Sequence, residues 1–262
     1  ASAKAFVDTL ARPTTERLAT RVGRRRLLVI GATAGALLVT AGVIARVTTS
    51  RTNPAVYPAG MVLVPSGDYP VGGVADRPAR SVALDSFYID STEVTVAAYR
   101  QFLDSTHGTA PWHGTPPSDW PATGILWIEA QRFCAWRGTA LPTEDQWEAA
   151  ARGSQGWRYP WGDRWDPARA NAGAVADTLK PVGGFPLGRS FVGAVDMIGN
   201  AWEWVAAEVA TPRGAIRHVI KGGAFNTSPG SATTSNRIAY PDDRRSLWLT
   251  GFRCARPASG NR

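Results

Sequence analysis

The tryptophans of this chain constrain its fold more than any other feature of the sequence. All eleven lie after residue 111, in a region that glycine and proline interrupt every few residues. Frequent glycine and proline keep helices and strands short. Such a chain buries its large rings beneath irregular loops, and it needs cross-links or bound ions to hold those loops together. We therefore expect little regular secondary structure and at least one such fastening.

The segment VDMIGNAWEW, which ends at Trp204, places Glu203 between two tryptophans. In an extended segment the rings of Trp202 and Trp204 share one face, and the carboxylate points to the other. A carboxylate held beside such large rings must be paired, so we expect a cation or a metal ion next to it. The alternative is an exposed glutamate on an edge strand.

Periodicity and capping residues predict a few short elements earlier in the chain. The residues between 107 and 123 form a surface loop, in which Trp112 and Trp120 either line a binding groove or pack onto the core. Three helices are expected to pack together, with Trp147 as an anchor. The predicted elements are a hairpin over residues 61–71, a strand over 81–89 with Val82, Leu84 and Tyr88 on its buried face, a helix from the cap Thr95 to Leu103, a helix over 127–136, and a helix that begins at the capping pair Thr143 and Gln146 and ends at Gly153.

Five motifs resemble, in order and spacing, the formylglycine-generating-enzyme family, also called the sulfatase-modifying-factor family. The resemblance extends from Met61 to Arg256. It implies an α+β domain with this family's fold, which is related to C-type lectins and contains little regular secondary structure. The motifs are LPTEDQWEAAARG from Leu141, YPWG from Tyr159, GNAWEW from Gly199, KGGAF from Lys221 and GFRCAR from Gly251.

The same resemblance implies two structural calcium sites. Hard oxygen ligands that include carboxylates suit calcium, and solvated polar groups at the surface are the alternative. The spacing around Asp177 departs from the family pattern, which weakens the second site. The implied ligands are Asp196, Gly199, Ala201 and Glu203 at the first site, and Asn171, Ala172, Asp177 and Leu179 at the second.

The two cysteines correspond to the family's structural disulfide. Cys134 lies in FCAWRG and Cys254 in GFRCAR, which resemble the two linked positions. Closing a loop of about 120 residues stabilises a fold by roughly 4 to 5 kcal/mol in the chain-entropy model. Two free buried thiols are the alternative, which an oxidising compartment disfavours.

The resemblance does not extend to the catalytic residues. The family's oxidases carry two cysteines, five residues apart, that follow the KGG motif, bind copper and attack the substrate thiol. Thr227 and Ala232 occupy those positions here, and neither can form a thiolate. The three histidines have no metal-binding spacing, and Ser231 and its neighbours lack an obvious base. We therefore expect no catalytic residue and no copper.

The net charge of +8 belongs almost entirely to the N-terminal part. Residues 1 to 51 contain nine basic and two acidic residues, which leaves +1 for the rest of the chain. A nearly neutral domain does not present the basic surface that a nucleic-acid partner requires. We therefore expect no binding to nucleic acid.

An uncharged apolar run from Leu27 to Ala45 lies within this basic part. As a helix it spans roughly 28 Å, close to the hydrocarbon thickness of a bilayer. Five arginines precede it and two follow it, so the positive-inside rule places the N-terminus in the cytoplasm. The predicted organisation is a cytoplasmic segment over residues 1–23, a transmembrane helix over 24–46, a linker over 47–60 and an extracytoplasmic domain over 61–262, on a bacterial inner membrane.

Two further questions concern this run: whether it is cleaved, and whether its small residues contact another helix. Arg24, Arg25 and Arg26 before an apolar stretch resemble a cleaved twin-arginine export signal, although no clear cleavage site follows. Within a retained anchor, Gly31, Gly35 and Gly42 share one face, and small residues at this spacing allow another membrane helix to approach closely. The alternative is that small residues are merely common in weakly apolar anchors.

These expectations combine into one predicted function. The chain is a non-catalytic, membrane-anchored binding or scaffold module, fastened by a disulfide and calcium, that serves as an accessory subunit of an inner-membrane complex, for instance an electron-transport or photosynthetic one. The runner-up is a divergent family enzyme, a non-haem iron enzyme or maturation factor, that acts on an exported peptide or metabolite. A lectin-like carbohydrate-binding module is a third hypothesis.

Overall fold

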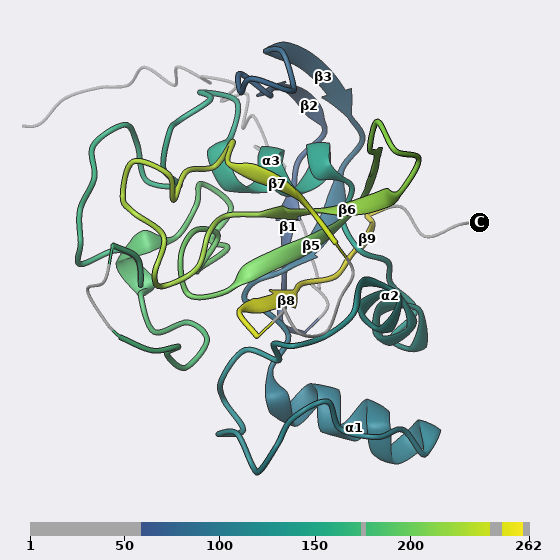
Figure 1. The fold of residues 1–262 in the computed structure, drawn as a ribbon. Helices are drawn as coiled ribbons and strands as arrows, with labels where there is room; N and C mark the ends of the chain where they lie inside the picture. The colour runs from purple at the N-terminus through teal and green to yellow at the C-terminus, as the bar shows by residue number, and fades with distance from the viewer. Residues whose placement is uncertain (1–58, 174–176, 242–247, 259–262) are drawn as a thin grey trace, which may run out of the picture. The chain divides into compact units, whose positions relative to one another are not determined.

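The structure is a computed structural model that describes residues 59–173, 177–241 and 248–258. The predicted cytoplasmic segment, the transmembrane helix with Gly31, Gly35 and Gly42, and most of the linker lie outside these residues. None of the helices within the described ranges combines the length and apolar character that a bilayer crossing requires. The α+β class is confirmed in the domain itself (Figure 1).

Nine short strands in three sheets and three α-helices make up the regular structure of the described part, together with one 3₁₀ turn at Pro186–Gly188. The first sheet has the order β1-β4-β9, so the last strand lies beside an early one. The sheets are β1 (Met61–Val64), β4 (Phe87–Asp90) and β9 (Ala255–Pro257); β2 (Gly67–Val71) and β3 (Arg80–Leu84); and β7 (Arg237–Tyr240), β6 (Ile216–Lys221), β5 (Trp202–Ala210) and β8 (Thr250–Phe252), in that order.

The hairpin predicted over residues 61–71 is wrong. β1 and β2 both form, but β1 pairs with β4 and β2 pairs with β3, so no ladder joins them. The strand predicted over 81–89 is also wrong in part, because the chain breaks between β3 and β4. The break reverses the alternation, so that Phe87 and Ile89 are buried and Tyr88 is half-buried.

The helices lie close to their predicted bounds. α1 (Val96–Thr106) begins at the predicted cap Thr95 and ends one turn later than expected, where His107 adopts a left-handed conformation. α2 is Trp127–Trp136, as predicted. α3 (Glu144–Arg152) has the predicted capping box, in which Thr143 and Gln146 bond each other's backbone amides.

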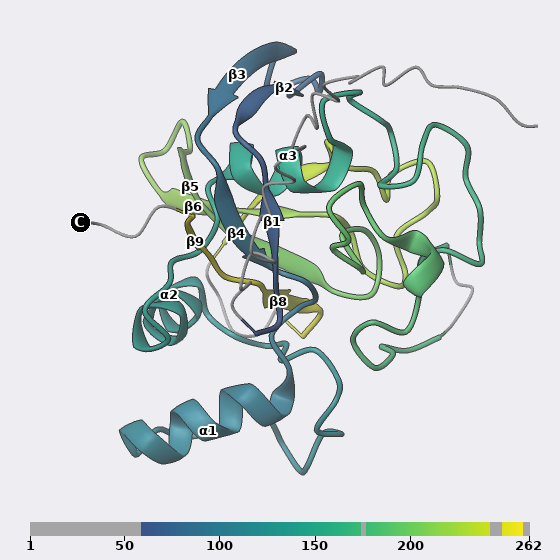
Figure 2. The same cartoon turned by 180° about the vertical axis from the view of Figure 1, so that it is seen from behind.

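The three helices do not form one cluster. α1 and α2 contribute to an apolar core that also contains Phe252 and Trp204, whereas the Trp147 side chain of α3 lies in a second core between β2, β4 and β6. Figures 1 and 2 show α1 and α2 as neighbours at one end of the domain, away from α3. Trp147 is fully buried, so it is an anchor as predicted, but in the second core.

A buried network of ion pairs fixes α3 to the strands around it. The Lys221 ammonium is completely buried and lies 3.1 Å from Glu148 Oε2 and 3.5 Å from Glu144 Oε1. Burial lowers the pKa of Lys221, and the charge of Glu148 opposes that effect. Arg77, from the turn between β2 and β3, donates to the same Glu148 carboxylate. The lysine of the KGG motif therefore has a structural role.

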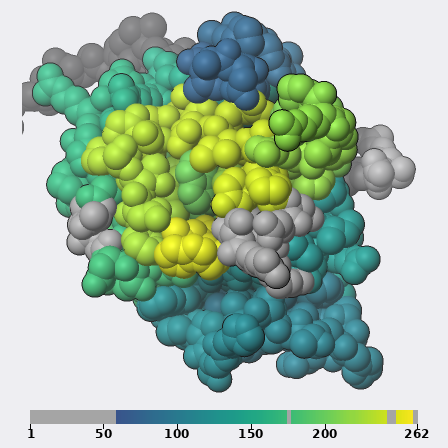
Figure 3. All heavy atoms as spheres, viewed as in Figure 1, coloured from purple at the N-terminus to yellow at the C-terminus, as the bar shows by residue number. Residues whose placement is uncertain are grey.

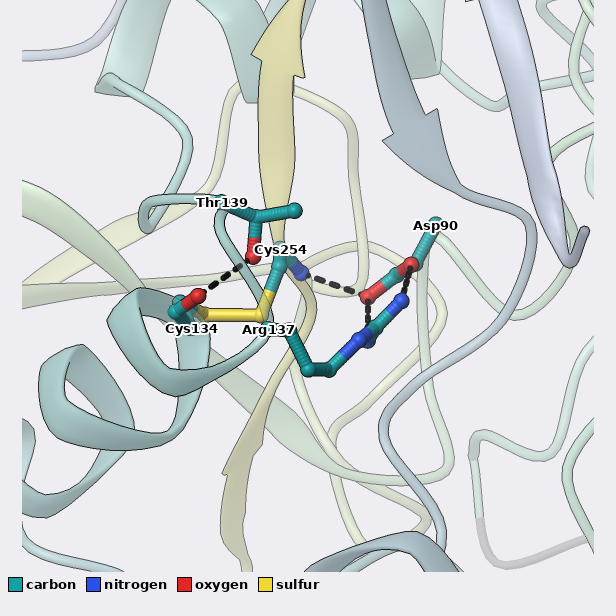
Figure 4. Close-up of a disulfide and its surroundings, with 5 residues drawn as sticks. All are labelled: Asp90, Cys134, Arg137, Thr139 and Cys254. Atoms are coloured by element: carbon teal, nitrogen blue, oxygen red, sulfur yellow. Dashed lines mark hydrogen bonds and ion pairs between the residues drawn. A yellow bond between two sulfur atoms is a disulfide. The ribbon is translucent and has the colours of Figure 1, made fainter. Parts of the chain in front are cut away.

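Cys134 and Cys254 form the predicted disulfide, which ties α2 to the segment between β8 and β9 (Figure 4). Asp90 reinforces the junction. Its carboxylate accepts two hydrogen bonds of 2.9 Å from Arg137 and one of 2.8 Å from the backbone amide of Cys254. The first sheet and the first core are therefore joined at this point.

Candidate functional site

The segment singled out by its tryptophans lies at the centre of a buried polar cluster. The cluster joins four parts of the chain: the turn before α1, the loop around residue 171, the segment that leads into β5, and the residue after β8. Each member is at most 5% exposed. We call this set the polar cluster: Glu93, Asn171, Asp196, Asn200, Glu203 and Arg253.

Glu203 is paired with a guanidinium group. Arg253 Nε donates to Glu203 Oε2 and Arg253 Nη2 to Glu203 Oε1, both at 2.7 Å, while the Trp147 indole donates a third hydrogen bond to Oε2. This bidentate geometry gives the strongest kind of protein ion pair. The prediction of a cation beside Glu203 is thus confirmed. One lone pair on Oε1 is left for a further partner.

Asn200 connects the other members of the cluster. Its amide nitrogen donates to Glu93 Oε1 at 2.9 Å, and its amide oxygen accepts from Asn171 Nδ2 at 3.0 Å and from the Lys180 backbone at 2.9 Å. The Asn200 backbone amide also donates to the Asn171 carbonyl. The loops around residues 171 and 180 are therefore held to the strand β5 through one side chain.

The backbone of this segment requires unusual conformations. Asp196, Gly199 and Asn200 all have φ between 54° and 77°, in the left-handed region that aspartate, asparagine and glycine tolerate best. A Cβ atom on Gly199 would lie 2.4 Å from the Asn171 carbonyl oxygen. Gly199 is therefore needed both for its backbone angle and for the close approach of the two loops.

Three oxygens in the cluster are buried without a hydrogen-bond partner. They are Glu93 Oε2, Asn171 Oδ1 and Asp196 Oδ1. Burial raises the pKa of Asp196 to about 6. Burial, together with the charges of Asp196 and Glu203, raises the pKa of Glu93 well above its usual value. The cluster therefore holds three carboxylates, only one of which has a paired cation.

These features fit a hard divalent cation. When Glu93 and Asp196 are both ionised, the cluster has two surplus negative charges and three unpaired oxygens, which are the complement of a calcium ion. No backbone amide in the described loops donates to the carbonyl oxygen of Gly199 or Ala201, which leaves both free as ligands. Across the described ranges, no three His, Cys, Asp or Glu side chains converge as a complete ligand set. A cation here would consequently take backbone and amide oxygens as well.

The residues predicted for the second calcium site are only partly assembled. Asn171 and Ala172 are fully buried, and Asn171 donates to the Thr178 carbonyl. Asp177 is exposed, and Leu179 packs against the small apolar cluster around Phe225. The structure thus brings Asn171 into the polar cluster, beside the first predicted site, and leaves the Asp177 side chain at the surface.

The positions of the family's catalytic cysteines hold a hydrogen-bonded threonine and a buried alanine. Thr227 Oγ1 accepts a hydrogen bond of 2.9 Å from the Ala224 amide, and Ala232 is fully buried. Both cysteines of the chain are in the disulfide. The chain between β6 and β7, which contains both positions, forms the yellow-green region left of the centre of the face in Figure 3.

Sequence reasoning missed Glu93, Asn200 and Arg253 as members of the cluster. Asn200 and Arg253 lie inside the motifs GNAWEW and GFRCAR, so their presence in a motif was the available signal. Glu93 follows a strand and precedes a helix cap in an ordinary polar turn. Only its position in the folded chain indicates its role.

The close approach at Gly199 generates a direct prediction. Replacing Gly199 with Ala should destabilise the domain by at least about 3 kcal/mol, because left-handed strain adds to a collision with the Asn171 carbonyl. Gly214→Ala is the matched control, since Gly214 has a similar φ of 80° but no atom within 4 Å of its added Cβ. It should cost about 1 kcal/mol. Denaturant unfolding measures both, and equal losses would contradict the close approach.

Comparison with known proteins finds relatives of similar sequence. It is 31% identical to "Inactive C-alpha-formylglycine-generating enzyme 2" of Mus musculus, over 76% of this chain and 86% of that protein. It is 30% identical to "Hercynine oxygenase" of Mycolicibacterium smegmatis, over 74% of this chain and 60% of that protein, and 27% identical to "Formylglycine-generating enzyme" of Bos taurus, over 76% and 73%.

Solved structures support the same fold. PvdO from Pseudomonas aeruginosa matches with a TM-score of 0.63 at 24% identity, covering 75% of this chain and 94% of that one. CarF matches with a TM-score of 0.62 at 24% identity, covering 77% and 99%. Residues 47–258 match the model of the sulfatase-modifying factor enzyme 1-like domain. The chain therefore belongs to the sulfatase-modifying-factor, or formylglycine-generating-enzyme, family.

Proposed function

We propose that this protein is a non-catalytic member of its family that works as a membrane-anchored binding module. The observation that carries the proposal is the chemistry at the family's catalytic positions. Thr227 and Ala232 provide no thiolate, and the only two cysteines are cross-linked. A soft cuprous ion needs sulfur ligands, so the family's copper chemistry has no residues to support it here. The similarity to a relative named inactive agrees with this proposal.

Structural calcium is a second part of the proposal. The ligands would be Asp196, Asn171 and Glu93 through their unpaired oxygens, the carbonyls of Gly199 and Ala201, and the remaining lone pair of Glu203. A bound ion would neutralise the surplus charge and hold loops that carry little regular structure. It would have no part in a reaction. The loops around the polar cluster would thereby be kept rigid.

Membrane anchoring and a membrane-protein partner complete the proposal. The apolar run from Leu27 to Ala45 and its flanking arginines support an anchor with the domain outside the cytoplasm of a bacterial inner membrane. The small-residue face of Gly31, Gly35 and Gly42 supports contact with another membrane helix. An accessory subunit of a larger complex, of electron-transport or photosynthetic type, would use both parts.

Metal analysis, together with an assay for oxidation of a cysteine-containing peptide, decides between a binding module and an enzyme. The purified full-length protein should contain neither copper nor iron in stoichiometric amount and should not oxidise a cysteine-containing peptide. The double variant with Thr227→Cys and Ala232→Cys should gain copper(I) binding that neither single variant shows, because a linear cuprous site needs two thiolates. Metal analysis and competition with a copper(I) chelator measure this. Iron, copper or turnover in the natural protein would favour the divergent-enzyme hypothesis.

The calcium proposal predicts opposite effects of one variant under two conditions. Asp196→Asn should weaken calcium binding at least roughly tenfold, because one carboxylate ligand is lost. In chelator at neutral pH the same variant should be more stable than the natural protein by roughly 1 to 2 kcal/mol, because a buried surplus charge is removed. Exposed Asp104→Asn should change neither quantity. Thermal melting with calcium or chelator gives the answer, and identical curves for all samples would exclude the site.

The anchor proposal is tested with helix variants. Gly31→Ile with Gly35→Ile should release the protein from its native detergent-extracted complex while leaving it in the membrane fraction, because bulky side chains prevent close helix contact. Ala32→Ile with Ala36→Ile alters a different face at the same spacing and should leave the complex intact. Native gel electrophoresis of solubilised membranes reports the particle size. If alkaline carbonate released the natural protein from the membrane, the anchor proposal would be contradicted.

A further inference from the structure

A cavity of about 890 Å³ lies between α1 and α2, apart from the polar cluster. Its three walls are α1, α2 and the segment 108–113. The third wall exists because the chain reverses at the end of α1. His107 takes a left-handed conformation, and the Gly108 amide bonds the Leu103 carbonyl at 2.9 Å. The segment that follows then runs back beside the helix.

The lining of this cavity is mainly apolar and partly aromatic. Phe102 and Leu103 form the floor, with Tyr99 and Ala110 beside them. Trp136 forms one wall, where its ring packs 5.6 Å from that of Phe102 and remains 45% exposed. A large aromatic side chain that is nearly half exposed at the edge of a cavity is typical of a ligand site.

One charged group at the rim has no partner. Arg132 is exposed, lines the cavity, and forms no hydrogen bond or ion pair with any residue that the structure describes. The nearby Glu129 is different, because its carboxylate accepts a hydrogen bond of 2.9 Å from the Leu126 amide at the start of α2. His113 adds a second basic side chain at the rim. Both charges therefore lie at this cavity, but the Glu129 carboxylate is held at the start of α2, whereas the Arg132 guanidinium is available to a ligand.

The shape excludes several classes of ligand. The lining residues extend from Tyr99 to Thr106 on α1 and from Glu129 to Trp136 on α2. Each span is roughly 10 Å at the helical rise, so the cavity is longer than a single flat ring. An extended peptide would need partners for its backbone groups, and the two helical walls offer none because their groups bond internally. A flexible apolar chain that ends in an acid matches both the length and the charge.

We propose that this cavity binds a medium-chain fatty acid, with the alkyl chain between α1 and α2 and the carboxylate paired with Arg132. Each methylene that the walls cover strengthens binding by up to about fourfold. The Arg132 guanidinium selects the acid over an alcohol or an amine. This site is independent of the proposed calcium ion and of the membrane helix.

A decanoate analogue with a photoreactive diazirine on its chain tests the site. The full-length protein in lipid nanodiscs should be labelled on peptides that contain residues 99–106 and 129–136, as mass spectrometry would show. Decanoate should compete, whereas decanol and decyltrimethylammonium should compete at least about tenfold less well. Labelling that decanol suppresses equally, or that falls only on residues 24–46, would overturn the proposal.

Two variants separate the contribution of the Arg132 charge to binding from that of the space inside the cavity. Arg132→Gln should lower labelling about tenfold, because it removes a charge-assisted hydrogen bond. Its matched control is Arg213→Gln in the turn between β5 and β6, which is also exposed and should label normally. Ala135→Trp should abolish labelling by filling the cavity. All three should melt like the natural protein, and full labelling of Arg132→Gln or Ala135→Trp would contradict the assignment.

Discussion

The pairing of Glu203 with Arg253 is the interaction on which the rest of the domain depends. It joins β5 to the end of β8, and Arg253 also donates to the carbonyls of Asp90 and Val195, each at 3.0 Å. One guanidinium thus connects the first sheet, the four-stranded sheet and the segment before β5. A fully buried ion pair is stable only when its remaining hydrogen bonds are satisfied, and nearly all of them are. Loss of either partner would leave a buried charge between three parts of the chain.

Around this pair the domain uses polar contacts where other folds use long helices and sheets. Asn200 holds two loops to β5, Asp90 reinforces the disulfide, and Lys221 fixes α3. These contacts have direction, so they determine loop conformations that apolar packing would leave open. The polar cluster is nevertheless incomplete, since Asp196, Glu93 and Asn171 each have an unpaired oxygen. The calcium ion that we propose would bind these oxygens and so complete the cluster.

The family membership and the loss of the catalytic thiols lead to one view of this chain. The domain has the residues that hold its parts together, including the lysine of KGG at α3 and the arginine of GFRCAR at β5, although Thr227 and Ala232 occupy the positions for copper. The helices α1 and α2 enclose a separate cavity, which we propose as a ligand site. A domain held together in this way would suit the binding role that we propose, because a surface ordered in advance loses less entropy when a partner binds.

The sequence by itself determined the family, the three helices, the N-caps of α1 and α3, and the absent thiols. These depend on local residue order, because a capping box or a motif lies within a few neighbouring positions. The choice of strand partners was decided only by the tertiary structure: β1 and β2 each fit a hairpin locally, yet pair with β4 and β3. The membership of Glu93 in the polar cluster was likewise a tertiary fact, since Asn200, which binds it, is 107 positions away. Long-range contacts of this kind leave no periodic signal in the chain, because burial and charge select them among residues that are distant in sequence.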